Sequence, residues 1–145
     1  MTLKELLYMF IDIVSKNGNL LLNVGPMVDG TIPEIQKERL SGLGKWLEVN
    51  GEAIFETRPW KYAEGTTLES IPVRFTQKND YLYAILMGRP VTDTITLENL
   101  NLEGISNVNL LGNKEELSWR LEESNLTIQI PRNMEDTLAI TFRIT

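Results

Sequence analysis

The chain has 145 residues, of which 42% are hydrophobic and 23% are charged, and its formal net charge is -6. Its 20 acidic and 14 basic residues are scattered without a block of one sign, which argues against nucleic acid or an anionic membrane as a partner. With no cysteine and no histidine, disulfides, Ser-His or Cys-His triads and the usual zinc sites are excluded. Any catalysis would rest on carboxylates, tyrosine or lysine, and we expect no cofactor and no metal.

No segment approaches the roughly 20 apolar residues of a membrane span, and the first residues lack the pattern of a secretory signal. The sequence therefore predicts a soluble chain without a recognisable targeting signal. Cytoplasmic, periplasmic and secreted locations all stay open.

The first predicted element is a helix from Thr2 to Ser15. Thr2 and Glu5 have the spacing of a capping box, and Asn17-Gly18 supplies a left-handed stop. At about 100° per residue, the apolar side chains cover an arc of roughly 200°, which is wider than the stripe of an ordinary surface helix. We therefore expect this helix to be covered on more than one side.

Asn19 to Val24 form a short, nearly continuous apolar run that is closed by Gly25-Pro26. Such a run is typical of a strand buried on both faces, as in a parallel sheet beneath helices. Because one parallel strand cannot form a sheet alone, its neighbours must lie outside this chain or be replaced by something else.

A second helix is predicted from about Ile32 to Val49, with Thr31 and Glu34 as a capping box and Asn50-Gly51 as its stop. Its apolar face is narrower than that of the first helix and consists of Ile35, Leu40, Leu43, Trp46 and Leu47. We expect Trp46 to be a core residue. The order helix, strand, loop, helix is a slice of an α/β repeat.

After Gly51 the sequence changes to short alternating runs separated by turn residues, which indicates an antiparallel sandwich. The predicted strands are Val73 to Gln77, Tyr81 to Met87, Thr92 to Leu97, Val108 to Leu111, Leu117 to Glu122, Leu126 to Ile130 and Leu138 to Ile144. Hairpin turns are predicted at Lys78-Asn79-Asp80 and at Glu123-Ser124-Asn125. The span Phe55 to Ile71 is predicted to be an irregular connection.

Several motifs, taken in their order and spacing, carry a resemblance to a known family. They are Lys16-Asn17-Gly18-Asn19-Leu20-Leu21-Leu22-Asn23-Val24-Gly25-Pro26, Asp29-Gly30-Thr31-Ile32-Pro33, Gly44-Lys45-Trp46-Leu47, Asn50-Gly51-Glu52-Ala53-Ile54-Phe55 and Thr57-Arg58-Pro59-Trp60. Together they resemble the end of the catalytic domain in bacterial-type α-L-fucosidases of glycoside hydrolase family 29. Later segments, such as Val73-Arg74-Phe75-Thr76 and Leu117-Ser118-Trp119, look like the C-terminal sandwich of the same enzymes.

The resemblance implies a fold with an α/β remnant and an all-β part. Residues 1–57 would be the last helix, strand and helix of a (β/α)8 barrel, residues 58–72 a connection, and residues 73–145 a C-terminal antiparallel β-sandwich. It also implies a retaining glycoside hydrolase that releases terminal α-L-fucose from glycans, with two carboxylates roughly 5 Å apart. In the family these carboxylates come from earlier barrel strands, so we expect the isolated chain to be inactive and structural, and to meet fucosylated glycans only through the full-length enzyme.

No catalytic residue is assigned within the chain, and three residues are candidates for the rim of the sugar pocket. Asn23 ends the predicted barrel strand and Asp29 lies in the loop that follows it, where barrel enzymes keep their chemistry. The alternative is that both satisfy backbone groups in a tight connection. Trp60 either stacks on a sugar ring or fills the seam between barrel and sandwich.

Two alternatives to an inactive fucosidase fragment stay open. The sandwich could be a non-catalytic carbohydrate-binding module. Otherwise the chain could be a subunit that self-associates, or that completes a split enzyme by docking its broad apolar helix on the missing barrel.

Overall fold

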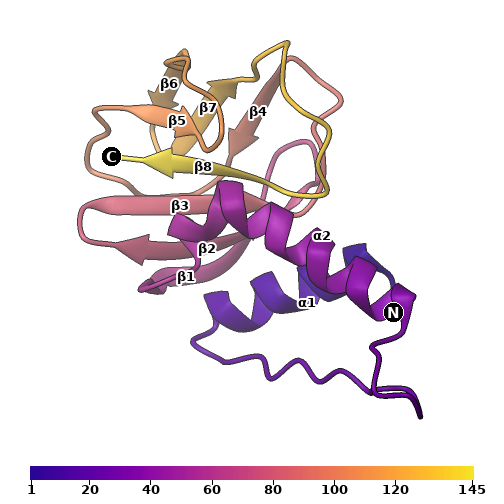
Figure 1. Ribbon diagram of the computed structural model, residues 1–145. Helices are drawn as coiled ribbons and strands as arrows, with labels where there is room; N and C mark the ends of the chain where they lie inside the picture. The colour runs from indigo at the N-terminus through magenta and orange to yellow at the C-terminus, as the bar shows by residue number, and fades with distance from the viewer.

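Two helices precede eight strands in the computed structural model, which describes residues 1–145 (Figure 1). The helices are α1 (Leu3–Ser15) and α2 (Glu34–Asn50), and α2 continues into the short 3-10 helix η1 (Gly51–Ala53). The strands are β1 (Arg58–Thr66), β2 (Pro72–Lys78), β3 (Tyr81–Leu86), β4 (Thr94–Leu97), β5 (Val108–Leu110), β6 (Trp119–Glu122), β7 (Asn125–Gln129) and β8 (Ile140–Ile144). Every strand predicted for the sandwich is present, with ends that differ by one or two residues. Neither helix is long and apolar enough to cross a lipid bilayer.

Both predicted ends of α1 are confirmed. The Thr2 hydroxyl accepts the Glu5 N–H at 3.1 Å, and the Glu5 carboxylate accepts the Thr2 N–H at 2.7 Å, which completes the capping box. At the other end Asn17 has a φ of 66°, and the Gly18 N–H donates to the Ile13 carbonyl at 2.8 Å. This is the Schellman arrangement, in which a left-handed residue lets the chain satisfy the last helical carbonyls.

Helix α2 forms close to its predicted position, but neither of the predicted end signals is used. Pro33 is the N-cap and no side chain caps the helix, because the Thr31 hydroxyl donates to the Asp29 carboxylate instead. At the C-terminal end Gly51 has a right-handed φ of -59°, so the chain tightens into η1 without a left-handed stop. Trp46 is buried as predicted, whereas Ile35 is 58% exposed, so the apolar face of α2 is only partly covered.

The predicted strand from Asn19 to Val24 does not form in this chain. The segment is an irregular part of the connection between α1 and α2 (Figure 1), and Leu21 is 94% exposed. The physical reason is that a parallel strand needs backbone hydrogen bonds from neighbouring strands, and no segment of the chain pairs with this one. An apolar run alone is not sufficient for a strand.

The β part is an antiparallel sandwich, as predicted. Its larger sheet has the order β1-β2-β3-β8-β5, and its smaller sheet has the order β4-β7-β6. Both predicted hairpins are confirmed, since Lys78 pairs with Tyr81 and Glu122 pairs with Asn125. The intervening Asn79 and Glu123 have φ values of 54° and 56°, as tight turns of this kind require.

The expectation that Phe55 to Ile71 form an irregular connection is wrong for about half of that span. Arg58–Thr66 is strand β1, which pairs with β2 at the edge of the larger sheet. The ladder is interrupted by a bulge, because pairing jumps from Pro59↔Thr76 to Glu64↔Arg74. The bulge removes the strict alternation of apolar and polar residues that would have identified a strand in the sequence.

Two hydrophobic cores lie on the two faces of the larger sheet. Strand β3 contributes to both, since Leu82, Ala84 and Leu86 face the smaller sheet while Tyr83 and Ile85 face the helices. The first core also includes residues of β4, β5, β7 and β8, and the second includes Leu7, Ile11, Trp46, Ala53 and Ile54. Helices, larger sheet and smaller sheet therefore form three packed layers (Figure 1).

Candidate functional site

The two candidates in the α1–α2 connection are exposed. Asn23 makes no side-chain hydrogen bond, and its segment is not a strand of either sheet. The Asp29 carboxylate accepts the Thr31 hydroxyl at 2.7 Å and the Thr31 N–H at 3.0 Å, and these hydrogen bonds lower the pKa of Asp29. Asp29 thus stabilises its own turn, in agreement with the structural alternative for this residue.

Trp60 lies apart from those two residues, in the bulge of β1. Its ring packs on Phe75 with a centroid distance of 5.0 Å and meets Tyr62 edge-on at 5.2 Å. It is partly buried against the core between the two sheets, whereas Asn23 and Asp29 belong to the connection from α1 to α2. The three predicted rim residues are therefore not brought together within this chain.

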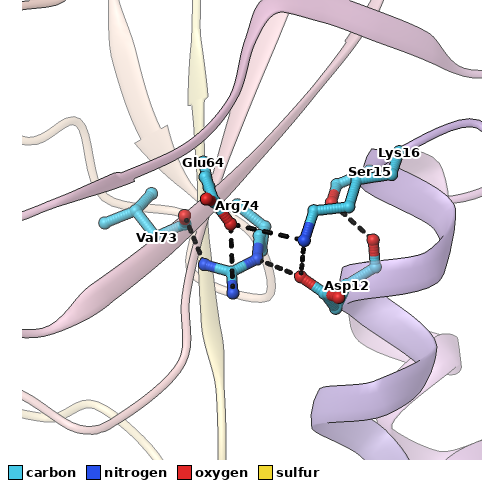
Figure 2. Close-up of polar contacts among 6 residues, drawn as sticks. All are labelled: Asp12, Ser15, Lys16, Glu64, Val73 and Arg74. Atoms are coloured by element: carbon cyan, nitrogen blue, oxygen red, sulfur yellow. Dashed lines mark hydrogen bonds and ion pairs between the residues drawn. The ribbon is translucent and has the colours of Figure 1, made fainter.

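A charged cluster joins α1 to the larger sheet, and we call its members Asp12, Lys16, Glu64 and Arg74 the Asp12 cluster. Figure 2 shows one Asp12 carboxylate oxygen between the Arg74 Nε at 2.5 Å and the Lys16 Nζ at 2.8 Å. One Glu64 oxygen lies 3.3 Å from the Lys16 Nζ and 3.5 Å from an Arg74 terminal nitrogen. Arg74 is the most enclosed member, with 17% of its side chain exposed.

The Asp12 cluster is electrostatically balanced. The hydrogen bond from Lys16 and the adjacent Arg74 guanidinium lower the pKa of Asp12, and the same contact with Asp12 raises the pKa of Lys16. Asp12 and Lys16 therefore each favour the charged form of the other. Such a cluster fixes the position of a helix on a sheet.

A second polar cluster joins η1 to the same face of the sheet. The buried Tyr83 hydroxyl donates to the Glu52 carboxylate at 2.8 Å, and the Arg143 guanidinium approaches the same oxygen at 3.2 Å. Nearby, the Thr76 hydroxyl donates to the Ala53 carbonyl at 2.6 Å. Burial, followed by the bond to Glu52, raises the pKa of Tyr83, so its hydroxyl stays protonated and serves as a structural donor.

Glu5, Asp12 and Asp29 lack the raised pKa that a glycosidase acid needs. Their pKa values are lowered, because hydrogen bonds favour the charged form. No group of three or more His, Cys, Asp or Glu side chains could hold a metal ion. The two polar clusters described above join α1 and η1 to the larger sheet.

Sequence reasoning missed the residues that join the layers. The spacing of Asp12 and Lys16 suits a pair on one helical face, so that pair could have been found. Arg74 and Glu64 could not, because they are far away in the chain and reach Asp12 and Lys16 only through the packing of α1 on β1 and β2.

Comparison with known proteins identifies the family to which this chain belongs. A family model described as Alpha-L-fucosidase matches residues 1–52, and one described as Alpha-L-fucosidase C-terminal domain matches residues 67–145. The helical part and the sandwich thus match two consecutive parts of one kind of protein. The chain belongs to the α-L-fucosidase family.

Individual relatives agree with this assignment. The chain is 36% identical over 134 residues to the human plasma alpha-L-fucosidase, covering 91% of this chain and 29% of that protein. It is 41% identical over 128 residues to an alpha-L-fucosidase of Branchiostoma floridae, covering 88% of this chain and 28% of that protein. The chain therefore spans less than a third of the length of these curated relatives.

Solved structures match over the full length of the chain. The Thermotoga maritima alpha-fucosidase superposes with a TM-score of 0.91 at 39% identity, covering 100% of this chain and 35% of that one. Alpha-L-fucosidase isoenzyme 1 from Paenibacillus thiaminolyticus superposes with a TM-score of 0.83 at 28% identity, covering 100% of this chain and 34% of that one. The three-layer arrangement is thus also found within larger fucosidases.

Proposed function

We propose that the chain is the C-terminal portion of an α-L-fucosidase, a retaining glycoside hydrolase that releases terminal α-L-fucose from fucosylated glycans. Its own role is structural: it contributes no catalytic carboxylate and supports the part of the enzyme that does. The observation that carries this proposal is the superposition of the whole chain on about a third of the Thermotoga enzyme, at a TM-score of 0.91.

Residues 1–57 are proposed to be the end of the catalytic barrel, and residues 73–145 its attached sandwich. The gap between the two family matches, from residue 52 to residue 67, supports a boundary in this region. Strand β1 extends the sandwich back to Arg58, so little of the proposed connection at 58–72 is left as a linker.

The segment from Asn19 to Val24 is proposed to be a strand of that barrel when the remaining strands are present. Exposed apolar side chains favour this proposal, because Leu21 is 94% exposed and the nearby Val28 is fully exposed. Leu22 and Met27 in the same stretch are also exposed, and a group of exposed apolar side chains commonly marks an interaction surface. In this arrangement Asn23 and Asp29 would lie at the rim of the sugar pocket, and Trp60 would fill the seam between barrel and sandwich.

The experiment is complementation of a barrel from the Thermotoga relative. That enzyme, shortened by the segment that this chain matches, is mixed or fused with the chain, and turnover of an aryl α-L-fucoside is measured. We expect no turnover by the chain alone and turnover when both parts are present. Turnover by the chain alone, or none by a folded complex of the two parts, would overturn the proposal.

A matched pair of variants tests the barrel strand itself. Leu21→Asp places a charge in the proposed strand, where it would be buried only in the complete barrel, so we expect complementation to fail while the free chain unfolds as before. Val91→Asp makes the same kind of change at a sandwich position that is 99% exposed and should complement normally. Equal turnover by both variants would show that Asn19–Val24 is not a buried strand of the barrel.

A further inference from the structure

The bulge in β1 redirects two aromatic rings at the edge of the sandwich. The single residue Phe75 lies opposite the whole stretch from Trp60 to Ala63. The side chains of this stretch therefore do not alternate regularly between the two faces of the sheet. Bulges at sheet edges commonly re-aim side chains in this way. Trp60 turns inward onto Phe75, while Tyr62 lies at right angles to Trp60 and remains 39% exposed.

A cavity of about 310 Å³ opens beside this bulge. One wall is formed by Tyr62 and Phe75, and the other by residues 98–101, which follow β4. Just beyond it Thr67 pairs with Leu97, so the cavity lies where the chain passes from the larger sheet to the smaller one. Its volume is at the lower end of the range of about 300–1,000 Å³ found for small-molecule sites, and suits a single ring.

The aromatic wall is held in place before any ligand binds. Asn101 donates from its side-chain amide to the Tyr62 hydroxyl oxygen at 2.9 Å and accepts the Ser124 hydroxyl at 2.8 Å. The Lys61 ammonium donates to the Asn101 carbonyl at 3.0 Å and lies 5.3 Å from the Tyr62 ring centroid. Because these contacts fix the ring, little conformational entropy would be lost when a ligand packs against it.

The opposite wall offers polar groups that the protein does not use. The Glu98 carboxylate and the Asn99 side-chain amide make no hydrogen bond or ion pair within the chain, although both line the cavity. The Tyr62 hydroxyl accepts from Asn101 and keeps its own hydrogen free to donate. Glu98, which has no cation partner in the chain, makes the cavity less favourable for an anion.

We infer that this cavity binds one neutral sugar ring of a glycan. The apolar C–H face of the ring would pack on Tyr62, and its hydroxyls would donate to Glu98 and exchange hydrogen bonds with Asn99. The lining supplies an aromatic ring from β1 and, from residues 98–101, side chains without a hydrogen-bond partner in the chain. The choice of a sugar as the ligand rests on the proposed function.

The experiment is an NMR titration of the isotope-labelled chain with methyl α-L-fucoside and, separately, with a neutral fucosylated trisaccharide. We expect saturable shift changes confined to residues 61–66 and 98–101, in the millimolar range. Tyr62→Ala and Glu98→Ala should each weaken binding about tenfold or more. Tyr81→Ala is the matched control, because Tyr81 is a similarly exposed tyrosine, at 37%, on the separate strand β3.

Several outcomes would overturn the inference. These are no shift changes at tens of millimolar sugar, changes at other residues only, or equal binding by Tyr62→Ala and Tyr81→Ala. Equally strong binding of an anionic sugar acid would contradict the charge argument. Complementation of the Thermotoga barrel without sugar binding here would overturn this inference alone, whereas sugar binding without complementation would overturn the proposed function alone.

Discussion

Replacing Ile11 by alanine tests whether the helices and the sandwich unfold as one unit. Ile11 is fully buried and belongs to the core that α1 shares with Tyr83 and Ile85 of β3. The substitution removes three carbon atoms, which at about 0.8 kcal/mol each is a transfer term of about 2.4 kcal/mol. The cavity left behind adds to this, so we expect a total loss of about 3–4 kcal/mol.

For a chain of this size, a loss of that magnitude should lower the thermal midpoint by about 6–16 °C. The measurement is thermal unfolding, followed both by far-UV circular dichroism and by near-UV signals from the sandwich. Because the Ile11 core lies directly on the larger sheet, we expect both signals to shift together.

The matched control is Ile35→Ala. Ile35 is on α2 but is 58% exposed, so its loss should change the free energy of unfolding by less than about 0.5 kcal/mol. If Ile11→Ala unfolds the helical signal early and leaves the sandwich midpoint unchanged, the helices are an independent layer and the reasoning is refuted. Equal midpoints for the two variants would refute it as well.

Two further variants test single contacts. Asp12→Asn should cost about 1 kcal/mol or less, since Asp12 is partly exposed although Arg74 is mostly enclosed. The pKa of Asp12 is lowered in the folded chain, so this contribution is present above the unfolded pKa of about 3.9 and lost as the pH falls through the folded value. Urea midpoints of wild type and variant should therefore differ at pH 7 and converge at about pH 2, and a difference that persists in acid would contradict the assignment. Gly112→Ala should destabilise the chain by at least about 1 kcal/mol more than Gly30→Ala. Gly112 and Gly30 have similar positive φ values, 83° and 84°. Only at Gly112 would an added Cβ meet another residue, at 2.6 Å from the Val49 side chain. Equal thermal midpoints for the two variants would exclude a tight contact there.

Local signals in the sequence were sufficient for most elements of the fold. The capping box at Thr2 and Glu5, the left-handed Asn17 and the two short hairpins were all predicted correctly. Each depends on residues only a few positions apart, where side-chain chemistry decides backbone geometry directly.

The errors share a different cause. Thr31 had the spacing of a cap but bonded to Asp29, and β1 was hidden because its bulge disrupts the alternating pattern. Asn19–Val24 had the composition of a buried strand but no neighbouring strand in this chain. A competing partner decided the outcome at Thr31, a register shift decided it in β1, and a missing partner decided it at Asn19–Val24.

The sequence by itself determined the class of the β part, the positions of strands β2 to β8, both helices and the resemblance to α-L-fucosidases. These depend on periodicity, turn residues and motif order, all of which can be read along the chain. Only the tertiary structure decided that the helices cover the outer face of the larger sheet, and that Asp12 meets Arg74 there. It also decided that a cavity opens between Tyr62 and Glu98. Such contacts join residues far apart in the chain, and their geometry follows from how the layers pack, which no local pattern encodes.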